Sequence, residues 1–397
     1  MKEIVQHLND HRTTLRMVVA EAVACAGDRN TSRLVSVRFA VPHRDVVRDF
    51  LAVETNDAFH WQEPSRNVAM VGLGRIETIE VHGAKRFAEA SRRSRELFES
   101  LHVVSLPGMQ ADGAESLSPS VGFGDESNGA DPRGPLLLGG FSFYDTVPDA
   151  ESPWSRLGPG RLVLPELLLV RRDGQTWATR TCRIQPGADV ESCLEGLCAD
   201  ISTGLTTGDP TPGMSLVDER ADEQAASGPE IHVRADRAHD QYRGQVEAAL
   251  AEIEAGKFEK VVLARSLHVT SDHGFELASF IATLTSMYPS CATVAVRQGD
   301  DLFISATPEK LVALAGCKVS TAAVAGSAPR GRSLEEEEGY SLALLRSEKE
   351  QVEHRVVRRA ICKALEPLCG EIDGPAEPQL LKLEGIQHLE TPLIGEL

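Results

Sequence analysis

The stretch ATVAVRQGDDLFISATPEKLVALAGCKVSTAAV, residues 292–324, decides the fold. It holds short segments rich in β-branched and apolar residues, and residues that favour turns separate them. The segments are residues 292–297, 302–306, 311–315 and 318–324. A series of this kind predicts neighbouring strands in a largely antiparallel sheet.

Helical patterns lie on both sides of this stretch. Before it, apolar residues recur at helical spacing from Gln241 to Ala255, and Gly256 stands where a helix commonly ends. After it, residues 342–368 carry one long helical pattern. A further strand is predicted for residues 260–269, between the first helix and the stretch.

The N-terminal half also alternates in the manner of strands, over residues 34–41 and 68–81. Gly72 and Gly74 fall in the second of these segments, where close packing of strands explains them better than nucleotide binding does. Residues 162–170 and 176–184 flank Asp173–Gly174, a dipeptide that predicts a β-hairpin. The whole pattern predicts an α+β fold of layered, largely antiparallel β-sheets with outer helices.

Two loose stretches divide the chain. Residues 106–140 are rich in Gly, Ser, Pro and Asp and predict a mobile loop, and residues 203–230 predict a boundary between lobes. We therefore expect an N-terminal lobe over residues 1–230 and a catalytic lobe over residues 231–397, interlocked in one structural domain.

Composition and charge narrow the classes of function. The net charge of −18 argues against nucleic acid or an anionic membrane as a partner, because both attract basic surfaces. The N-terminus lacks the apolar core of a signal peptide, and no apolar run is long enough to span a bilayer, so we expect a cytoplasmic protein. Its eight cysteines include no C-x-x-C pair, and we expect them to be reduced and without a role.

Lys260 and Glu309 are candidate acid–base residues. Lys260 begins KVVLAR, which has apolar residues on both faces of the predicted strand, so an inward-pointing amine would be desolvated and able to accept a proton. A lysine at a strand edge can equally reach past the sheet into water. Glu309 follows Pro308 where a strand leaves the core, and a partly buried carboxyl there could donate a proton. An exposed turn glutamate is the alternative.

Two further groups could bind ligands. Residues 325–331, AGSAPRG, follow a strand and could form a turn that points N–H groups and a hydroxyl at an anion, with Arg330 and Arg332 adding positive charge. The alternative is a simple connection. Glu350 and Glu353 lie on one side of the long helix and suit Mg²⁺ better than zinc, although Glu-rich helices are commonly just solvated. Residues 335–338 predict a solvated helix start.

Taken in order, these segments resemble the chorismate-utilising enzymes, a family that includes isochorismate, salicylate, anthranilate and aminodeoxychorismate synthases. KVVLAR, ATPEKL, AGSAPRG, SEKEQVEH and IQHLETP carry the resemblance from about residue 240 to the end. In the N-terminal half, WQEPS, GLG, GGFSF and LVLPE resemble isochorismate synthase in particular.

The resemblance implies a role for each matched residue. Lys260 would activate water for attack at ring carbon 2, and Glu309 would protonate the hydroxyl that leaves carbon 4. Glu353, supported by Glu350, would hold Mg²⁺, which clamps the substrate carboxylate. Gly326, Ser327, His388 and Thr391 would bind the substrate, chorismate. The ammonia-using members typically carry glutamine in place of this lysine, so water is the expected nucleophile.

The resemblance also leaves alternatives open. The family's chains continue for several dozen residues beyond the segment that matches QHLETP, and this part supplies a second metal-binding glutamate and closing strands. The chain ends at Leu397, so the catalytic part is expected to be truncated. We expect a monomeric isochorismate synthase, an isomerase that serves menaquinone or siderophore biosynthesis. A salicylate synthase and a non-catalytic, chorismate-binding remnant are the rival hypotheses.

Overall fold

The computed structural model describes residues 2–53, 55–109, 134–147, 149, 152, 154–199, 231–272 and 274–397. Most of the predicted loop at 106–140, and all of the predicted boundary at 203–230, lie outside the described residues. The chain forms two compact units, each discontinuous in sequence. Unit 1 comprises Met1–Pro210 and Ala278–Pro308, and unit 2 comprises Thr211–Leu277 and Glu309–Leu397. Residues 278–308, which fall inside the lobe predicted for 231–397, pack in unit 1.

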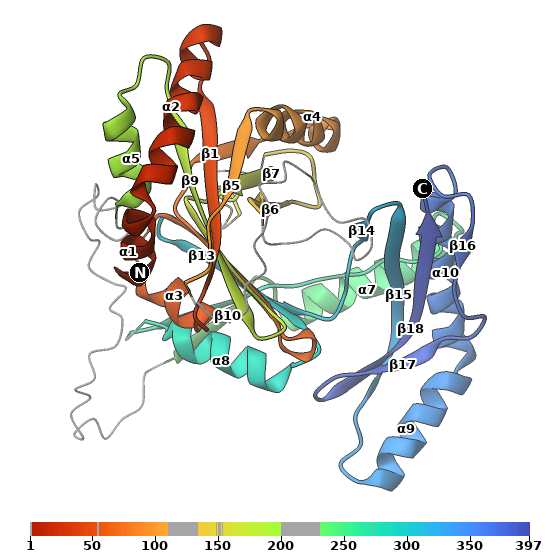
Figure 1. The fold of residues 1–397 in the computed structure, drawn as a ribbon. Helices are drawn as coiled ribbons and strands as arrows, with labels where there is room; N and C mark the ends of the chain where they lie inside the picture. Colours follow the sequence, from red (N-terminus) through yellow and green to blue (C-terminus); the bar gives the residue numbers. More distant parts are fainter. Residues whose placement is uncertain are drawn as a thin grey trace, which may run out of the picture. The chain divides into compact units, whose positions relative to one another are not determined.

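Unit 1 is built on an eight-stranded sheet (Figure 1). Every neighbouring pair in it is antiparallel except β1 and β5. In spatial order the strands are β13 (Asp301–Thr307), β12 (Ala292–Gln298), β2 (Asp57–Glu63), β3 (Val68–Leu73), β8 (Leu167–Arg172), β9 (Gln175–Ile184), β1 (Arg33–Val41) and β5 (Leu101–Ser105). A smaller sheet has the order β4 (Glu77–Glu80), β7 (Gly160–Leu164) and β6 (Leu138–Phe141).

Helices pack on both sheets of unit 1. The helical segments are α1 (Lys2–Asp10), α2 (Arg12–Arg29), α3 (Val46–Ala52), the 3-10 helix η1 (Pro64–Arg66), α4 (Arg86–Glu99), α5 (Val190–Cys198) and α8 (Leu277–Met287). Helix α2 packs on β1 and on α5, and Leu15, Val19, Leu194 and Leu197 are fully buried there. Burial of these apolar side chains stabilises the packing of the helices on the sheet.

Unit 2 contains a sheet with the order β14 (Ala313–Ala315), β15 (Lys318–Pro329), β18 (Ile386–Glu396) and β16 (Ile372–Asp373), and β17 (Gln379–Lys382) also pairs with β18. Its helices are α7 (His239–Glu254), α9 (Leu334–Arg346) and α10 (Glu348–Leu365). Helix α10 lies against β15 and β18 (Figure 1). A separate pair of strands, β10 (Ile231–Ala235) and β11 (Leu267–Ser271), completes the unit.

Several predictions are confirmed. The strands at 34–41, 292–297, 302–306 and 318–324 are present, and the hairpin of β8 and β9 turns at Asp173 and Gly174, both with positive φ. Gly72 is needed for close packing, because a Cβ there would lie 2.5 Å from Leu138 Cδ1. The α+β fold with largely antiparallel sheets is confirmed. No helix in the described part of the chain is both long and apolar enough to cross a bilayer.

Two predictions are wrong. Residues 260–266 form no strand, and Val262 is 80% exposed, so this segment is not buried on both faces as its apolar sequence suggested. An apolar run becomes a buried strand only where other strands pair with it, and β11 begins later, at Leu267. Residues 342–368 form two helices, because Ser347 leaves the helical conformation and its side chain accepts a hydrogen bond from the Glu350 N–H.

Candidate functional site

A β-bulge in β15 organises the site in unit 2. The register with β18 shifts between Ala325 and Ser327, so Gly326 is the extra residue and Ser327 stands opposite His388. Gly326 has φ +82°, a conformation that favours glycine. The turn predicted for residues 325–331 is therefore wrong, because β15 continues to Pro329. The bulge brings the Ser327 hydroxyl to 2.8 Å from His388 Nδ1.

The first turn of α10 delivers Glu350 to this bulge. Ser347 caps the helix, and the Glu350 side chain, 17% exposed, accepts a hydrogen bond from the Ser327 N–H at 3.2 Å. A Cβ at Gly326 would come within 3.2 Å of Glu350 Oε2. Glycine is thus favoured here on two grounds, because its backbone conformation strains other residues and because a Cβ would crowd the Glu350 carboxylate.

Glu353, one turn further along α10, forms an ion pair with Lys260. The Lys260 Nζ lies 3.5 Å from Glu353 Oε1, and the two side chains are 22% and 37% exposed. The sequence predicted that burial in a strand would desolvate the Lys260 amine. Lys260 does not lie in a buried strand, and the Glu353 carboxylate pairs with its amine instead. The structure therefore brings two of the predicted residues, from distant parts of the sequence, into contact.

Behind this pair lies a buried polar contact that the sequence did not suggest. His354 Nε2 lies 2.7 Å from Thr391 Oγ1, and His354 Nδ1 lies 3.3 Å from the carbonyl oxygen of Ala325. Burial is the main cause that lowers the pKa of His354, and Lys260 lowers it further. The sequence did give one indication that His354 belongs to the site, because it is four residues after Glu350 and follows Glu353 directly.

Glu309, the expected acid, follows Pro308 between β13 and β14 and is exposed. Its proposed part as an acid remains a prediction, as do the roles assigned to the other site residues.

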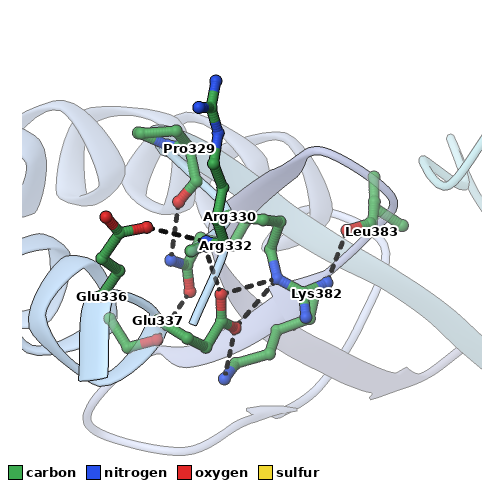
Figure 2. A network of polar contacts seen from close by, with 10 residues as sticks. Pro329, Arg330, Arg332, Glu336, Glu337, Lys382 and Leu383 are labelled. Carbon is green, nitrogen blue, oxygen red and sulfur yellow. Dashed lines mark hydrogen bonds and ion pairs between the residues drawn. The ribbon is translucent and has the colours of Figure 1, made fainter. Parts of the chain in front are cut away.

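A network of ion pairs lies at the end of the β15–β18 pairing, the strand pair that carries Ser327 and His388 (Figure 2). Glu337 accepts hydrogen bonds from Arg330 Nε, at 2.9 and 3.0 Å, and from the Gly331 N–H, and it pairs with Lys382 Nζ at 2.9 Å. These partners, with Lys382 the largest contributor, lower the pKa of Glu337 to about 2.

This network corrects two predictions. The prediction that residues 335–338 are merely solvated is wrong for Glu337, whose side chain is 16% exposed. Arg330 was expected to add positive charge to a binding turn, but it instead forms an ion pair with Glu337, which also pairs with Lys382. Arg330 also donates to the carbonyl oxygen of Leu383, which ties β15 to the segment that leads into β18.

The acidic pair on α10 has the donors that a hard cation needs. No cluster of three or more His, Cys, Asp or Glu side chains suited to a metal occurs among the residues that the structure describes. Mg²⁺, however, takes one or two protein carboxylates and completes its shell with substrate oxygens and water. Glu350 and Glu353 fit that requirement, and they do not fit a structural zinc site, which takes four protein ligands.

Comparisons with known proteins match the chain to one family. The family model described as "Chorismate binding enzyme" matches residues 114–397. The chain is 28% identical to isochorismate synthase MenF of Bacillus subtilis (strain 168), over 97% of this chain and 76% of that protein. It is 26% identical to the salicylate biosynthesis isochorismate synthase of Pseudomonas aeruginosa, over 99% of this chain and 73% of that protein.

A solved structure agrees at the level of the fold. MenF, the menaquinone-specific isochorismate synthase from Escherichia coli, has a TM-score of 0.66 to this chain at 19% identity, covering 95% of this chain and 76% of that one. Since the family model covers well over half of the sequence, including all the described residues of unit 2, the chain belongs to the chorismate binding enzyme family.

Proposed function

We propose that the chain is an isochorismate synthase, an isomerase that converts chorismate to isochorismate. The observation that carries this proposal is the contact between Lys260 and Glu353 within a unit that matches the chorismate binding family. The names of the relatives support the same reaction. We further propose a monomeric, cytoplasmic enzyme whose partner is its small-molecule substrate.

The proposed reaction exchanges one hydroxyl group for another. In the proposed step, Lys260 takes a proton from water as the water oxygen bonds to ring carbon 2. The ring double bonds shift, the bond from carbon 4 to its hydroxyl breaks, and Glu309 protonates the departing group as water. One water enters and one leaves, so the product is an isomer of the substrate, and proton exchange with solvent restores both side chains.

The other residues hold the substrate and its counter-ion. Glu353 and Glu350 would bind Mg²⁺, which would supply positive charge for the substrate carboxylate. Ser327 and His388 form a fixed pair of polar groups beside Gly326 for substrate contact. Thr391 was expected to bind the substrate, but its side chain is fully buried and bonds to His354, so we propose that it supports the site through His354, the neighbour of Glu353 in sequence.

The test is turnover of chorismate by the purified chain in the presence of Mg²⁺, with products separated by chromatography. We expect isochorismate, and a Lys260→Ala variant should lose roughly 100- to 10,000-fold in kcat, the usual contribution of a general base. Lys257→Ala is the matched control, because Lys257 is three residues away, is exposed and pairs only with Glu252 among the ion pairs of the described chain. Full turnover by Lys260→Ala would refute the assigned base.

The turnover assay, together with calorimetry, separates the rival functions. Salicylate, which is detected by its fluorescence, would identify a salicylate synthase that also releases pyruvate. Calorimetry with chorismate and Mg²⁺ tests the third possibility, since heat of binding without any product would identify a chorismate-binding protein that lacks catalysis.

A further inference from the structure

The Glu353 carboxylate in unit 2 has two candidate cations. Its Oε1 lies 3.5 Å from the Lys260 Nζ, and the proposed function also gives this carboxylate to Mg²⁺. The two side chains are 37% and 22% exposed, so water screens their ion pair only in part. How the two cations share one carboxylate is a question that rests on the proposed role of Glu353 as a metal ligand.

Glu350, the other carboxylate of the proposed metal site, has no such conflict. Its Oε2 accepts a hydrogen bond from the Ser327 N–H, a neutral donor, at 3.2 Å. Its Oε1 lies 3.3 Å from Lys349 Nζ, but the Lys349 side chain is 82% exposed, and an ion pair of that kind costs little to break. An oxygen that accepts one hydrogen bond keeps a further lone pair. Glu350 can therefore bind Mg²⁺ and keep its contact with Ser327.

An ammonium group and Mg²⁺ cannot both stay close to Glu353 at low cost. At about 4 Å, two unit positive charges repel by more than the thermal energy even in water, and Mg²⁺ carries two charges. Mg²⁺ also binds its oxygens at about 2.1 Å and holds them in a nearly octahedral shell. Binding of Mg²⁺ to this carboxylate therefore favours departure of the Lys260 amine.

The chain around Lys260 can stay in place when its amine moves. Glu259, the preceding residue, accepts a hydrogen bond from Arg359 Nη2 at 2.5 Å, and Arg359 is on α10, six residues after Glu353. This contact holds the segment against α10 without the help of Lys260. A lysine side chain has a flexible four-carbon stem, so rotation about its own bonds can carry the amine away from the carboxylate.

We propose that the Lys260 amine and Mg²⁺ compete for the Glu353 carboxylate, so that metal binding releases the amine from its ion pair. The competition couples two parts of the proposed reaction. The amine becomes available to the attacking water when the carboxylate takes up the cation that holds the substrate.

The coupling acts in both directions, because linkage between two binding events is reciprocal. The ion pair must weaken Mg²⁺ binding by the same factor by which Mg²⁺ weakens the ion pair. Removal of the amine should therefore tighten Mg²⁺ binding about two- to fivefold, the usual strength of a part-exposed ion pair.

The first experiment is zero-length cross-linking of the full chain with a water-soluble carbodiimide, which joins an amine to a carboxylate that it contacts. Mass spectrometry of the peptides measures the Lys260–Glu353 product as Mg²⁺ is added, while KCl keeps the ionic strength constant. We expect the product to form without Mg²⁺ and to fall at least about fivefold at saturating Mg²⁺. Lys257 and Glu252 are the matched internal control, because they lie 2.5 Å apart outside the proposed site, and their product should stay constant.

The second experiment is calorimetry of Mg²⁺ binding without chorismate. Lys260→Met should bind Mg²⁺ about two- to fivefold more tightly than the parent chain does. Lys257→Met removes the same charge three residues earlier and should leave the affinity unchanged. Glu353→Gln should abolish the heat of binding, which assigns the heat to this site. Circular dichroism and Tm measurements establish that each variant is folded.

Three results would each overturn the proposal. They are a Lys260–Glu353 product that does not form without Mg²⁺, a product that persists where calorimetry shows the site to be filled, and equal Mg²⁺ affinity for a folded Lys260→Met variant and the parent chain. None of them contradicts the proposed reaction, which chorismate turnover tests separately. A parent chain that binds no Mg²⁺ would overturn both this competition and the metal role of Glu353.

Discussion

His60 should make the stability of the protein depend on pH, and its removal should abolish that part of the dependence. His60 lies on β2 between Val71 and Ala295 and is completely buried, with its ring 5.7 Å from that of Phe50. Neither ring nitrogen has a hydrogen-bond partner among the described residues. Burial, the largest cause, lowers the pKa of His60 from 6.5 to about 4, with Asp45 opposing this shift and Arg171 adding to it.

The size and sign of the effect follow from linkage. The unfolded chain takes up a proton at His60 near pH 6.5, whereas the folded chain does so only near pH 4. Between these values the unfolded state binds more protons, so the free energy of unfolding falls as the pH falls. With these pKa values the loss between pH 7 and pH 5 is about 2 kcal/mol, and the full loss below pH 4 is about 3 kcal/mol.

The assay is urea unfolding, followed by circular dichroism at pH 7 and at pH 5, for the parent chain and for His60→Leu. The buried residues His7 and His354, whose pKa values are also lowered, contribute equally to both proteins, so the difference isolates His60. His43→Leu is the matched control because His43 is exposed. If His60→Leu loses as much stability as the parent between the two pH values, the reasoning about His60 is wrong.

Three further predictions concern unit 2. Thr391→Val should lower the free energy of unfolding by about 2 kcal/mol, because it leaves His354 Nε2 buried without its partner, whereas Thr270→Val on an exposed strand should change it little. Gly326→Ala should cost about 1 to 2 kcal/mol, measured by urea unfolding, and should lower kcat, because φ is +82° and the new Cβ would displace Glu350. Removal of Mg²⁺ by EDTA should abolish chorismate turnover and excess Mg²⁺ should restore it, while turnover that persists in EDTA would contradict the proposed metal site.

The strands of this fold were predictable where local pattern and tertiary environment agree. The alternation in β1 and β15 reflects one buried face, and Asp173–Gly174 supplies the positive φ values that a tight hairpin needs. The break at Ser347 was also readable, because a serine followed three residues later by Glu350 is a typical helix start. The long apolar pattern on either side concealed it.

The remaining features depend on distant parts of the chain. Nothing in the charge run at 335–338 indicates that Glu337 meets Lys382, 45 residues later in the sequence. The segment that begins at Lys260 is apolar, yet whether it is buried depends on strands that pair with it, which local sequence does not reveal. The ion pair of Lys260 with Glu353 likewise joins residues that are 93 positions apart in the sequence.

The extra residue at Gly326 divides β15 into two phases of side-chain direction. Up to Ala325, the odd-numbered residues lie on the buried face of the sheet. Beyond the bulge, the even-numbered Ala328 pairs with the buried Gln387 and so lies on that face. Without the bulge, regular pairing from Ala325 onward would place Gly326 opposite His388 and Ser327 opposite Gln387, while the part of the strand before the bulge kept its register. Any alignment or graft of this strand that assumes simple alternation will therefore exchange the inward and outward side chains at the position where Ser327 meets His388.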